Sequence, residues 1–349
     1  MWQIVMKTLI TPAEADRRIL RLREGFPSEE LPLLGVPGRI LREEIRADQD
    51  FPPFDRVMMD GLAVRSNGGR RFLVQGVAAA GMPQIVLPSA EDAAIEVMTG
   101  AVLPDGADAV LPCEWYDLHD GVAVLQTGKA AKAGEFIHRK GSDHRAGDAL
   151  LRSGVRLGPV EIGIAAACGC AEIQVAAPLR IAVLGTGDEL VPVGKVPKAG
   201  QIRRSNTHAL AAALQLAGHG PTAAGCLRDD PEDLRQGLAA VLSENDLVIL
   251  TGGVSKGRWD SVPEILVRLG ATSILHGIAQ RPGKPMGVWQ MPAGQVVFGL
   301  PGNPVSALVC LHRYVLPALS HWSGESTATR PRRILRGGFA KPPGLTLFL

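Results

Sequence analysis

The sequence IAVLGTGDE at residues 181–189 decides the fold, because a short apolar strand there runs directly into a turn of glycines and polar side chains. The same pattern recurs as LVILTGGVS at 247–255 and as VVFGLPGNPVS at 296–306. Turns of this kind follow the carboxyl ends of parallel strands, where helix amino termini and bare backbone N–H groups face a ligand and glycine lets phosphate oxygens approach. The three stretches therefore predict a binding site for a phosphorylated or otherwise anionic ligand.

Helix signals lie between these strands. Ser205 or Asn206 caps one helix, Asp230 and the proline after it open a second, and a third starts at Ser261 and ends at Gly270. Strands that alternate with helices at this spacing predict an α/β fold, a doubly wound parallel-sheet domain over 178–328.

The sequence before residue 178 has a different pattern of apolar and turn-forming residues. A capping-box pattern at Thr11 and Glu14 predicts a helix toward Arg23, and short apolar pieces alternate with Gly, Pro and Asp clusters after Phe51. An alanine-rich helix and a closing strand then follow, so the β-rich part is expected to be an insertion. The predicted domains besides the α/β one are a discontinuous helical linking domain (1–50 and 145–177), an inserted β-rich domain (51–144) and a remnant of a C-terminal β domain (329–349).

Composition narrows the function. The chain has 349 residues, is 46% hydrophobic and carries 37 Lys+Arg against 35 Asp+Glu, which gives a net charge of +2. Nucleic-acid binding is disfavoured, because there is no basic excess and aromatic residues make up 4% of the chain. Five scattered cysteines, no signal-like amino terminus and no run of about 20 apolar residues predict a cytoplasmic protein with no membrane span.

Two common nucleotide motifs do not fit the glycine turns. The turn at 185–189 lacks the third glycine of a dinucleotide fingerprint and has no helix directly after it, so NAD binding is disfavoured. A P-loop ATPase is disfavoured as well, because no Walker-type sequence occurs. Each turn taken alone remains open to a second interpretation as a mere tight strand exit, whereas three turns on one sheet edge favour binding.

Charged groups gather beside the glycine turns. Hard carboxylates next to a phosphate-binding loop suit Mg²⁺, which bridges a few protein oxygens to phosphate. We interpret Asp230 as a helix cap and expect its neighbour Asp229 to face the site. Prolines stiffen the loop that carries Arg281 and Lys284, which favours a binding role for these two cations. The acids at this edge are Asp188, Glu189, Asp229, Asp230 and Asp260.

Taken together, the ordered motifs resemble the molybdopterin molybdenumtransferase family, whose eukaryotic counterpart is the carboxy-terminal half of gephyrin. The resemblance covers nearly the whole chain. It implies that molybdate is inserted into adenylylated molybdopterin with release of AMP, in a Mg²⁺-dependent cytosolic reaction. The motifs that carry it are Asp60-Gly61, Thr99-Gly100-Ala101, Gly141 with Asp143, Thr186-Gly187-Asp188-Glu189, Ser205-Asn206, Thr251-Gly252-Gly253-Val254-Ser255 with Asp260, Pro282-Gly283-Lys284-Pro285, and Gly299-Leu300-Pro301-Gly302-Asn303-Pro304-Val305-Ser306.

The resemblance also implies a homodimer whose active site lies between the parallel-sheet domain of one subunit and the inserted domain of the other. In that arrangement Asp60, Thr99, Arg139 and Asp143 would face the partner's site across the interface. Molybdopterin adenylyltransferase and molybdoenzyme maturation proteins are candidate partners. The hypothesised catalytic residues are Asp60, Asp188, Glu189 and Asp260, the last three also holding the metal, and the substrate-binding residues are Thr99, Arg139, Asp143, Thr186, Gly187, Asn206, Asp229, Gly252, Gly253, Ser255, Arg281, Lys284, Pro301, Asn303 and Ser306.

Three points qualify the resemblance. Leu62 stands where the family usually has tyrosine, and Arg281 replaces the first lysine of a Lys-Pro-Gly-Lys loop. The family continues into a fourth, β-barrel domain, whereas the apolar run at 345–349 is expected to lack a partner strand, so we expect a truncated chain. Two rival functions remain open: a molybdopterin adenylyltransferase-like enzyme, and a non-catalytic scaffold that retains the pocket.

Overall fold

The computed structural model describes residues 9–254, 261–326 and 344–348. The chain forms two compact units. We call the first, which comprises Met1–Glu43, Arg152–Ile162 and Ala171–Leu349, the α/β unit. The second comprises Glu44–Leu151 and Gly163–Cys170 and is called the β unit.

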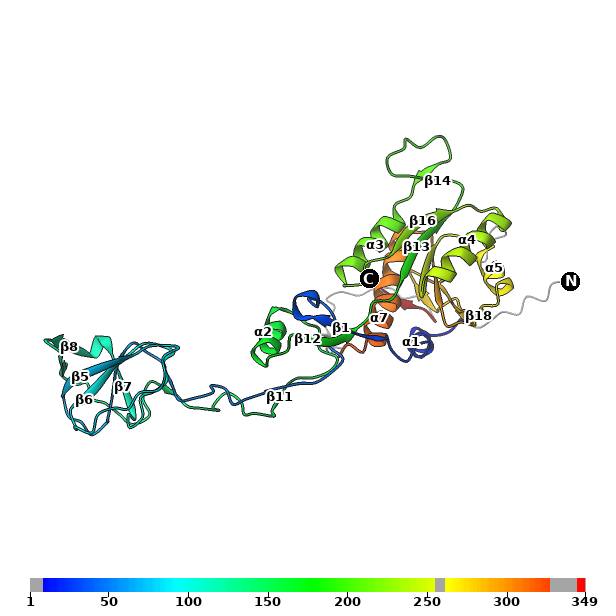
Figure 1. Cartoon of the computed structure of the whole chain (residues 1–349). Coiled ribbons are helices and arrows are strands. Elements are labelled where there is room, and N and C mark those ends of the chain that lie inside the picture. Colours follow the sequence, from blue (N-terminus) through cyan, green and yellow to red (C-terminus); the bar gives the residue numbers. More distant parts are fainter. Residues whose placement is uncertain (1–8, 255–260, 327–343, 349) are drawn as a thin grey trace. The chain divides into compact units, whose positions relative to one another are not determined.

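A six-stranded sheet forms the centre of the α/β unit (Figure 1). Its first four strands are parallel, and the last two, which form the far edge, run antiparallel to their neighbours. The sequence predicts a parallel sheet, and this edge is a correction to that prediction. The loop at 277–286, which contains the short strand β19 (Gln280–Arg281), joins β18 to β20 without the crossover helix that usually connects a parallel pair. In spatial order the strands are β16 (Ala223–Leu227), β13 (Ile181–Thr186), β17 (Leu247–Thr251), β21 (Val296–Leu300), β20 (Gly287–Gln290) and β18 (Thr272–His276).

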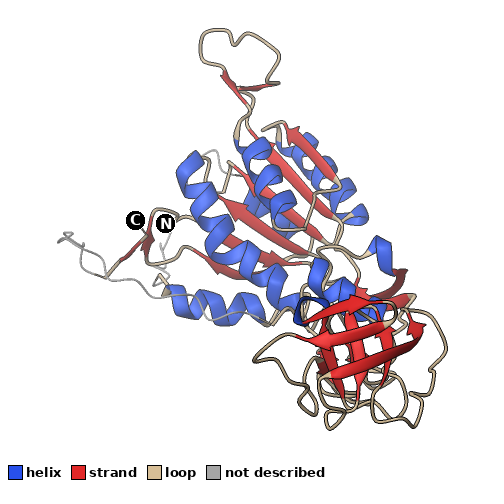
Figure 2. Ribbon diagram, turned by 90° about the vertical axis from the view of Figure 1, so that its left-hand side faces the viewer, coloured by secondary structure: helices blue, strands red, loops and turns tan. Residues whose placement is uncertain are grey.

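Helices cover both faces of this sheet, as Figure 2 shows. Alternate residues of each strand point to opposite faces, so Ile181 and Ile249 enter one hydrophobic core while Ala182 and Leu250 enter the other. The expected doubly wound α/β architecture is confirmed. The first core includes residues of α1 (Pro12–Leu20), α3 (Asn206–Leu216), α6 (Pro304–Cys310), the π-helical turn η3 (Leu311–Val315) and α7 (Leu316–Trp322), and the second those of α4 (Pro231–Glu244) and α5 (Val262–Arg268).

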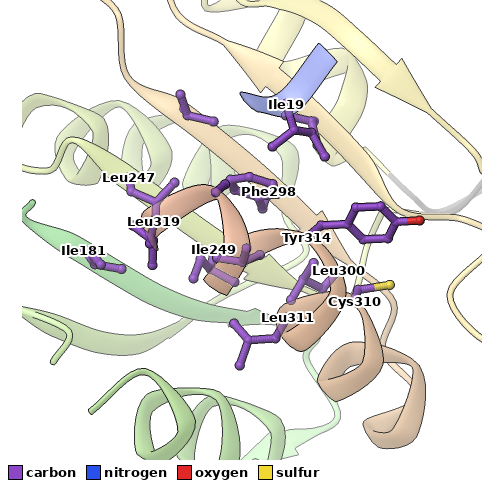
Figure 3. Close-up of a cluster of buried hydrophobic side chains, with 14 of the residues drawn as sticks. Ile19, Ile181, Leu247, Ile249, Phe298, Leu300, Cys310, Leu311, Tyr314 and Leu319 are labelled. Carbon is purple, nitrogen blue, oxygen red and sulfur yellow. The ribbon is translucent and has the colours of Figure 1, made fainter. Parts of the chain in front are cut away.

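The first core is shown in Figure 3. Phe298 from the sheet and Tyr314 from η3 are both fully buried, and Ile19 from α1 packs into the same cluster. A strand, a carboxy-terminal helix and the amino-terminal helix thus share one core, so the amino-terminal segment belongs to the α/β unit.

The predicted side-chain caps at Thr11 and Asp230 are confirmed, whereas Ser205 begins its helix without a side-chain capping hydrogen bond in the described part of the chain. The Thr11 hydroxyl accepts from the Glu14 amide at 3.2 Å, and Asp230 accepts from two amides at the start of α4. The Glu14 carboxylate pairs with Arg17 and Arg18, although a full capping box would turn it back toward the Thr11 amide. Helix α1 ends at Leu20, short of the expected Arg23, with Arg21 as its C-cap.

The remaining elements of the α/β unit are short. Thr346 and Leu347 pair in parallel with Gln280 and Arg281, so the terminal apolar run has a partner strand, contrary to expectation. These elements are β1 (Ser28–Pro32) paired with β12 (Glu172–Ala176), the turn η1 (Leu33–Gly35), β14 (Leu190–Val191) paired with β15 (Ile202–Arg203), and β19 (Gln280–Arg281) paired with β22 (Thr346–Leu347).

The β unit is built on a second six-stranded sheet of mixed direction. Apolar side chains on its two faces, such as Ile95 and Phe72, enter separate small cores. Its sheet strands, in spatial order, are β7 (Ala109–Pro112), β4 (Gly61–Val64), β6 (Ala93–Val97), β5 (Arg71–Ala78), β9 (Val122–Leu125) and β8 (Tyr116–His119). Its other elements are β2 (Ile45–Arg46), β3 (Arg56–Val57), η2 (Cys113–Trp115), β10 (Ile137–His138) and β11 (Ala149–Leu151), while α2 (Pro159–Ala167) spans the boundary between the units.

None of the helices in the described ranges has the length and apolar run that a membrane crossing requires.

Candidate functional site

Strand register brings the three glycine turns to one edge of the sheet. In the parallel ladder Gly185 lies opposite Thr251, and Thr251 lies opposite Leu300, so β13, β17 and β21 end at the same level. The central β17 pairs directly with both other strands. The predicted convergence of the three turns is therefore confirmed.

The turn after β17 is glycine for steric reasons. Gly252 has φ of +96° and Gly253 of +62°, a region that disfavours side chains. A Cβ on Gly252 would lie 2.7 Å from the Thr186 carbonyl oxygen, and one on Gly253 would lie 2.7 Å from the Thr186 hydroxyl oxygen. The two turns thus approach each other to a distance that only glycine permits.

Asn206, the first residue of α3, ties these turns together. Its Nδ2 donates to the Thr251 hydroxyl at 2.9 Å and to the Gly302 carbonyl at 2.8 Å. The Thr251 hydroxyl in turn donates to the Pro301 carbonyl at 3.2 Å. Asn206, predicted to bind substrate, therefore holds two of the three glycine turns at fixed positions.

A hollow of about 120 Å³ lies among these turns. It is lined by the turn after β13, the β14–β15 ribbon, the amino terminus of α3 and the turns after β17 and β21. Of the predicted residues, Thr186, Glu189, Asn206 and Gly252 line it. The sequence pattern thus identified residues from three separate segments that meet around one hollow.

The acids of this edge are brought together in part. The Asp188 amide donates to Asp229 Oδ2 at 3.3 Å and the Asp229 amide to Asp188 Oδ1 at 3.5 Å, so the two carboxylates flank each other. Arg228 approaches Asp188 at 3.6 Å. Within the described residues no group of three His, Cys, Asp or Glu side chains is arranged to hold a metal ion. Two exposed carboxylates nevertheless fit Mg²⁺, which often binds one or two carboxylates together with substrate phosphates.

The turn after β21 leads directly into α6. The Asn303 side chain caps that helix by accepting from the Ser306 amide at 3.1 Å, and Pro301 is buried. This geometry fixes the turn and commits the Ser306 amide, while the Ser306 side chain remains half-buried.

A buried network of hydrogen bonds fixes the backbone of the loop that carries Arg281 and Lys284. The Tyr314 hydroxyl bonds Gln280 Oε1, and Gln280 Nε2 donates to the Pro282 carbonyl at 3.1 Å. Gln280 is fully buried and Tyr314 is 1% exposed. Arg281 and Lys284 are exposed and do not line the hollow, so the network anchors their backbone and leaves the cations toward solvent.

In the β unit the predicted polar residues form two sets of contacts. Asp60 Oδ1 accepts from the Thr99 hydroxyl and amide, both at 2.7 Å, and these hydrogen bonds hold the pKa of Asp60 below its ordinary value. Asp143 pairs with His138 at 2.8 Å, whereas Arg139 donates at 2.6 Å to Asp55, which was not among the predicted site residues. Burial raises the pKa of Asp55, but the hydrogen bonds from the backbone of residue 140 and from Arg139 lower it by more. The pKa of Asp55 therefore lies below its ordinary value.

Comparisons with known proteins decide the family. Residues 10–169 match the MoeA N-terminal region (domain I and II), and residues 182–321 match a probable molybdopterin binding domain. A molybdopterin molybdenumtransferase of Synechocystis sp. is 42% identical over 314 residues, which cover 88% of this chain and 80% of that protein. The chain belongs to the molybdopterin molybdenumtransferase family.

Other members of the molybdenumtransferase family agree. The molybdopterin molybdenumtransferase of Haemophilus influenzae is 35% identical, with 88% of this chain and 76% of that protein covered. Among solved structures, a molybdopterin biosynthesis moea protein from Pyrococcus horikosii is 31% identical and superposes with a TM-score of 0.75 over 91% of this chain and 81% of that one. The resemblance seen in the sequence is confirmed.

The motifs of the molybdenumtransferase family did not point to every residue of the hollow. Arg204, Thr207 and Thr251 line it but were not predicted as site residues. Thr251 stands in one of the motifs that carry the resemblance, which was the signal that could have found it, whereas Arg204 looks like half of an exposed basic pair. Two predicted site residues, Ser255 and Asp260, lie outside the described residues.

Proposed function

We propose that this protein inserts molybdate into adenylylated molybdopterin and releases AMP, as a step of molybdenum cofactor biosynthesis. The observation that carries the proposal is the meeting of three glycine turns at one sheet edge, in a chain of the molybdopterin molybdenumtransferase family. A pyrophosphate-bearing substrate needs closely packed backbone donors, and turns of this kind supply them.

In the proposed reaction some residues of the chain bind the substrate and others hold the glycine turns in place. Gly252 lines the hollow and is proposed to let the phosphoryl groups approach the turn after β17, because no side chain projects from the two glycines there. Asn206 keeps the turns after β17 and β21 in register while charge builds up during anhydride cleavage. Fixed donors of this kind stabilise developing charge without reorganising, which is the larger part of catalysis for such reactions.

Magnesium dependence is part of the proposal. Asp188 and Asp229 are the described carboxylates that would hold Mg²⁺, with Glu189 beside them and Asp260 as the further predicted ligand. When bound, Mg²⁺ would neutralise charge on the phosphate oxygens. Arg281 and Lys284 are proposed to attract the molybdate and phosphate anions from the solvent side, where both side chains are exposed.

We also propose a homodimer whose site combines the α/β unit of one subunit with the β unit of the other. The support is chemical: Asp60 and Thr99 form an exposed hydrogen-bonded pair, and Arg139 is an exposed cation on the same unit. Arg139 would attract an anionic substrate, while Asp60 and Thr99 would supply polar groups for its uncharged parts. A cytoplasmic location and contacts with molybdopterin adenylyltransferase and molybdoenzyme maturation proteins belong to the same proposal.

One assay separates the three candidate functions. Purified protein is mixed with adenylylated molybdopterin and Mg²⁺, with and without molybdate, and AMP is measured. A molybdenumtransferase releases AMP when molybdate is present, an adenylyltransferase instead consumes ATP with unmodified molybdopterin, and a scaffold does neither. Molybdate-independent AMP release, or none, would contradict the proposal.

A further inference from the structure

The hollow at the glycine turns contains three polar atoms that the protein does not satisfy. Thr186 Oγ1, Thr207 Oγ1 and Arg204 Nε are buried and have no hydrogen-bond partner among the described residues. Thr186 is 4% exposed and Thr207 is 1% exposed. An unsatisfied buried donor costs free energy, and three of them around one hollow point to a missing acceptor.

The amino terminus of α3 faces the same hollow. Helix α3 has 11 residues, and its cap residue Ser205 makes no side-chain capping hydrogen bond within the described part of the chain. The first amides of a helix have no acceptor inside the helix and carry partial positive charge. The amide of Thr207 belongs to this first turn, so backbone and side-chain donors converge.

Charge at the hollow also favours an anion. Its lining contains two guanidinium groups, Arg203 and Arg204, and one carboxylate, Glu189. Arg203 is committed in part to the carbonyls of Val193 and Lys195, at 3.1 and 3.2 Å. Arg204 has a side-chain hydrogen bond with Cys226, and its buried Nε has no partner among the described residues. A volume of about 120 Å³ holds roughly four waters, which is room for one small tetrahedral group.

We propose that this hollow is a subsite for a tetrahedral oxyanion, with Arg204 as its charged recognition residue and the hydroxyls of Thr186 and Thr207 as further donors. The inference rests on the proposed function, in which two substrates carry such a group: the phosphoryl part of the adenylylated pterin, and free molybdate. Both present negatively charged oxygens in a tetrahedral arrangement, and the planar guanidinium suits either.

The test measures binding of two simple anions to the full chain. Molybdate and methyl phosphate are each dialysed to equilibrium against the native protein and against Arg204→Gln, at constant ionic strength. A charge-assisted hydrogen bond in a partly buried site predicts roughly a tenfold or greater loss of affinity in Arg204→Gln. Arg204→Lys keeps the charge without the fork and should fall between the two.

Matched controls separate this effect from a general loss of charge or of folding. Arg268→Gln removes an exposed arginine of α5 that pairs with Glu264, and its affinity should equal that of the native chain. Thr207→Val keeps the side-chain shape and removes one hydroxyl, so it should weaken binding while leaving the far-UV circular dichroism unchanged.

The outcomes are distinct. Loss of molybdate binding alone assigns the subsite to the free oxyanion, and loss of methyl phosphate binding alone assigns it to the phosphoryl group; both support the proposal. Equal affinities of Arg204→Gln and Arg268→Gln, or no binding of either anion to the native chain, overturn it. Dialysis needs no pterin, so a failure of AMP release contradicts the proposed function without affecting this result.

Discussion

The buried pair beneath the basic loop offers a sharp test of the structure. In Tyr314→Phe the hydroxyl that bonds Gln280 Oε1 is lost, while the ring still fills its space. Because Gln280 is fully buried, its oxygen is left without that donor and without water, which predicts a loss of about 1–3 kcal/mol in the free energy of unfolding. Urea unfolding can be followed by the fluorescence of Trp289 and Trp322, which are both buried in the α/β unit.

A double-mutant cycle makes this prediction refutable. Gln280→Met alone should also cost about 1–3 kcal/mol, because it strands the Tyr314 hydroxyl and the Pro282 carbonyl. Combining it with Tyr314→Phe removes both polar partners, so the double variant should be less destabilised than the sum of the two single variants. Losses that add to within about 0.5 kcal/mol would show that the pair is not coupled and would refute the reasoning.

Three further predictions concern the rest of the α/β unit. Gly253→Ala places a methyl against the Thr186 hydroxyl in a backbone region that costs roughly 1–2 kcal/mol for an L-residue, so urea unfolding should detect a loss and AMP release should fall. Burial, aided by the charge of Arg156, lowers the pKa of His219 from 6.5 to about 4. The unfolded chain therefore gains a proton first as pH falls from 6.5 to 4, which should remove about 3 kcal/mol of stability across that window in the native protein and not in His219→Gln. Asp188→Ala, at an exposed position, should cut molybdate-dependent AMP release by on the order of a hundredfold with an unchanged unfolding curve, and near-normal release would remove Asp188 from the catalytic set.

The sequence was sufficient for what depends on local pattern. Apolar strands that end in glycine turns predicted which segments meet, because parallel strands of one sheet present their carboxyl ends to the same edge. Asp230 was likewise predicted as a helix cap from its position before Pro231, and it caps α4. Such features are encoded within a few neighbouring residues.

Features that depend on distant contacts were not predictable from the pattern. Gln280 meets Tyr314 across 34 residues, and neither belongs to a motif. Arg204 reads as surface charge in the sequence, and its role emerges only when the fold places it beside Thr186 and Thr207. The partner of the terminal run was missed for the same reason, since β19 is too short to be recognised as a strand.

Asn206 fixes the positions of two glycine turns and takes no part in satisfying the other donors around the hollow. A primary amide has two N–H groups, and both are committed to the protein, one to the Thr251 hydroxyl and one to the Gly302 carbonyl. An aspartate there would have no donors and would set a carboxylate against a carbonyl oxygen, so it would push the turns after β17 and β21 apart. Because both N–H groups of Asn206 bond to the protein, contact with an anionic ligand is left to the first backbone amides of α3, Arg204 and the threonine hydroxyls. The division separates holding the site together from binding its ligand, and it predicts that an Asn206→Asp change harms the geometry of two turns at once.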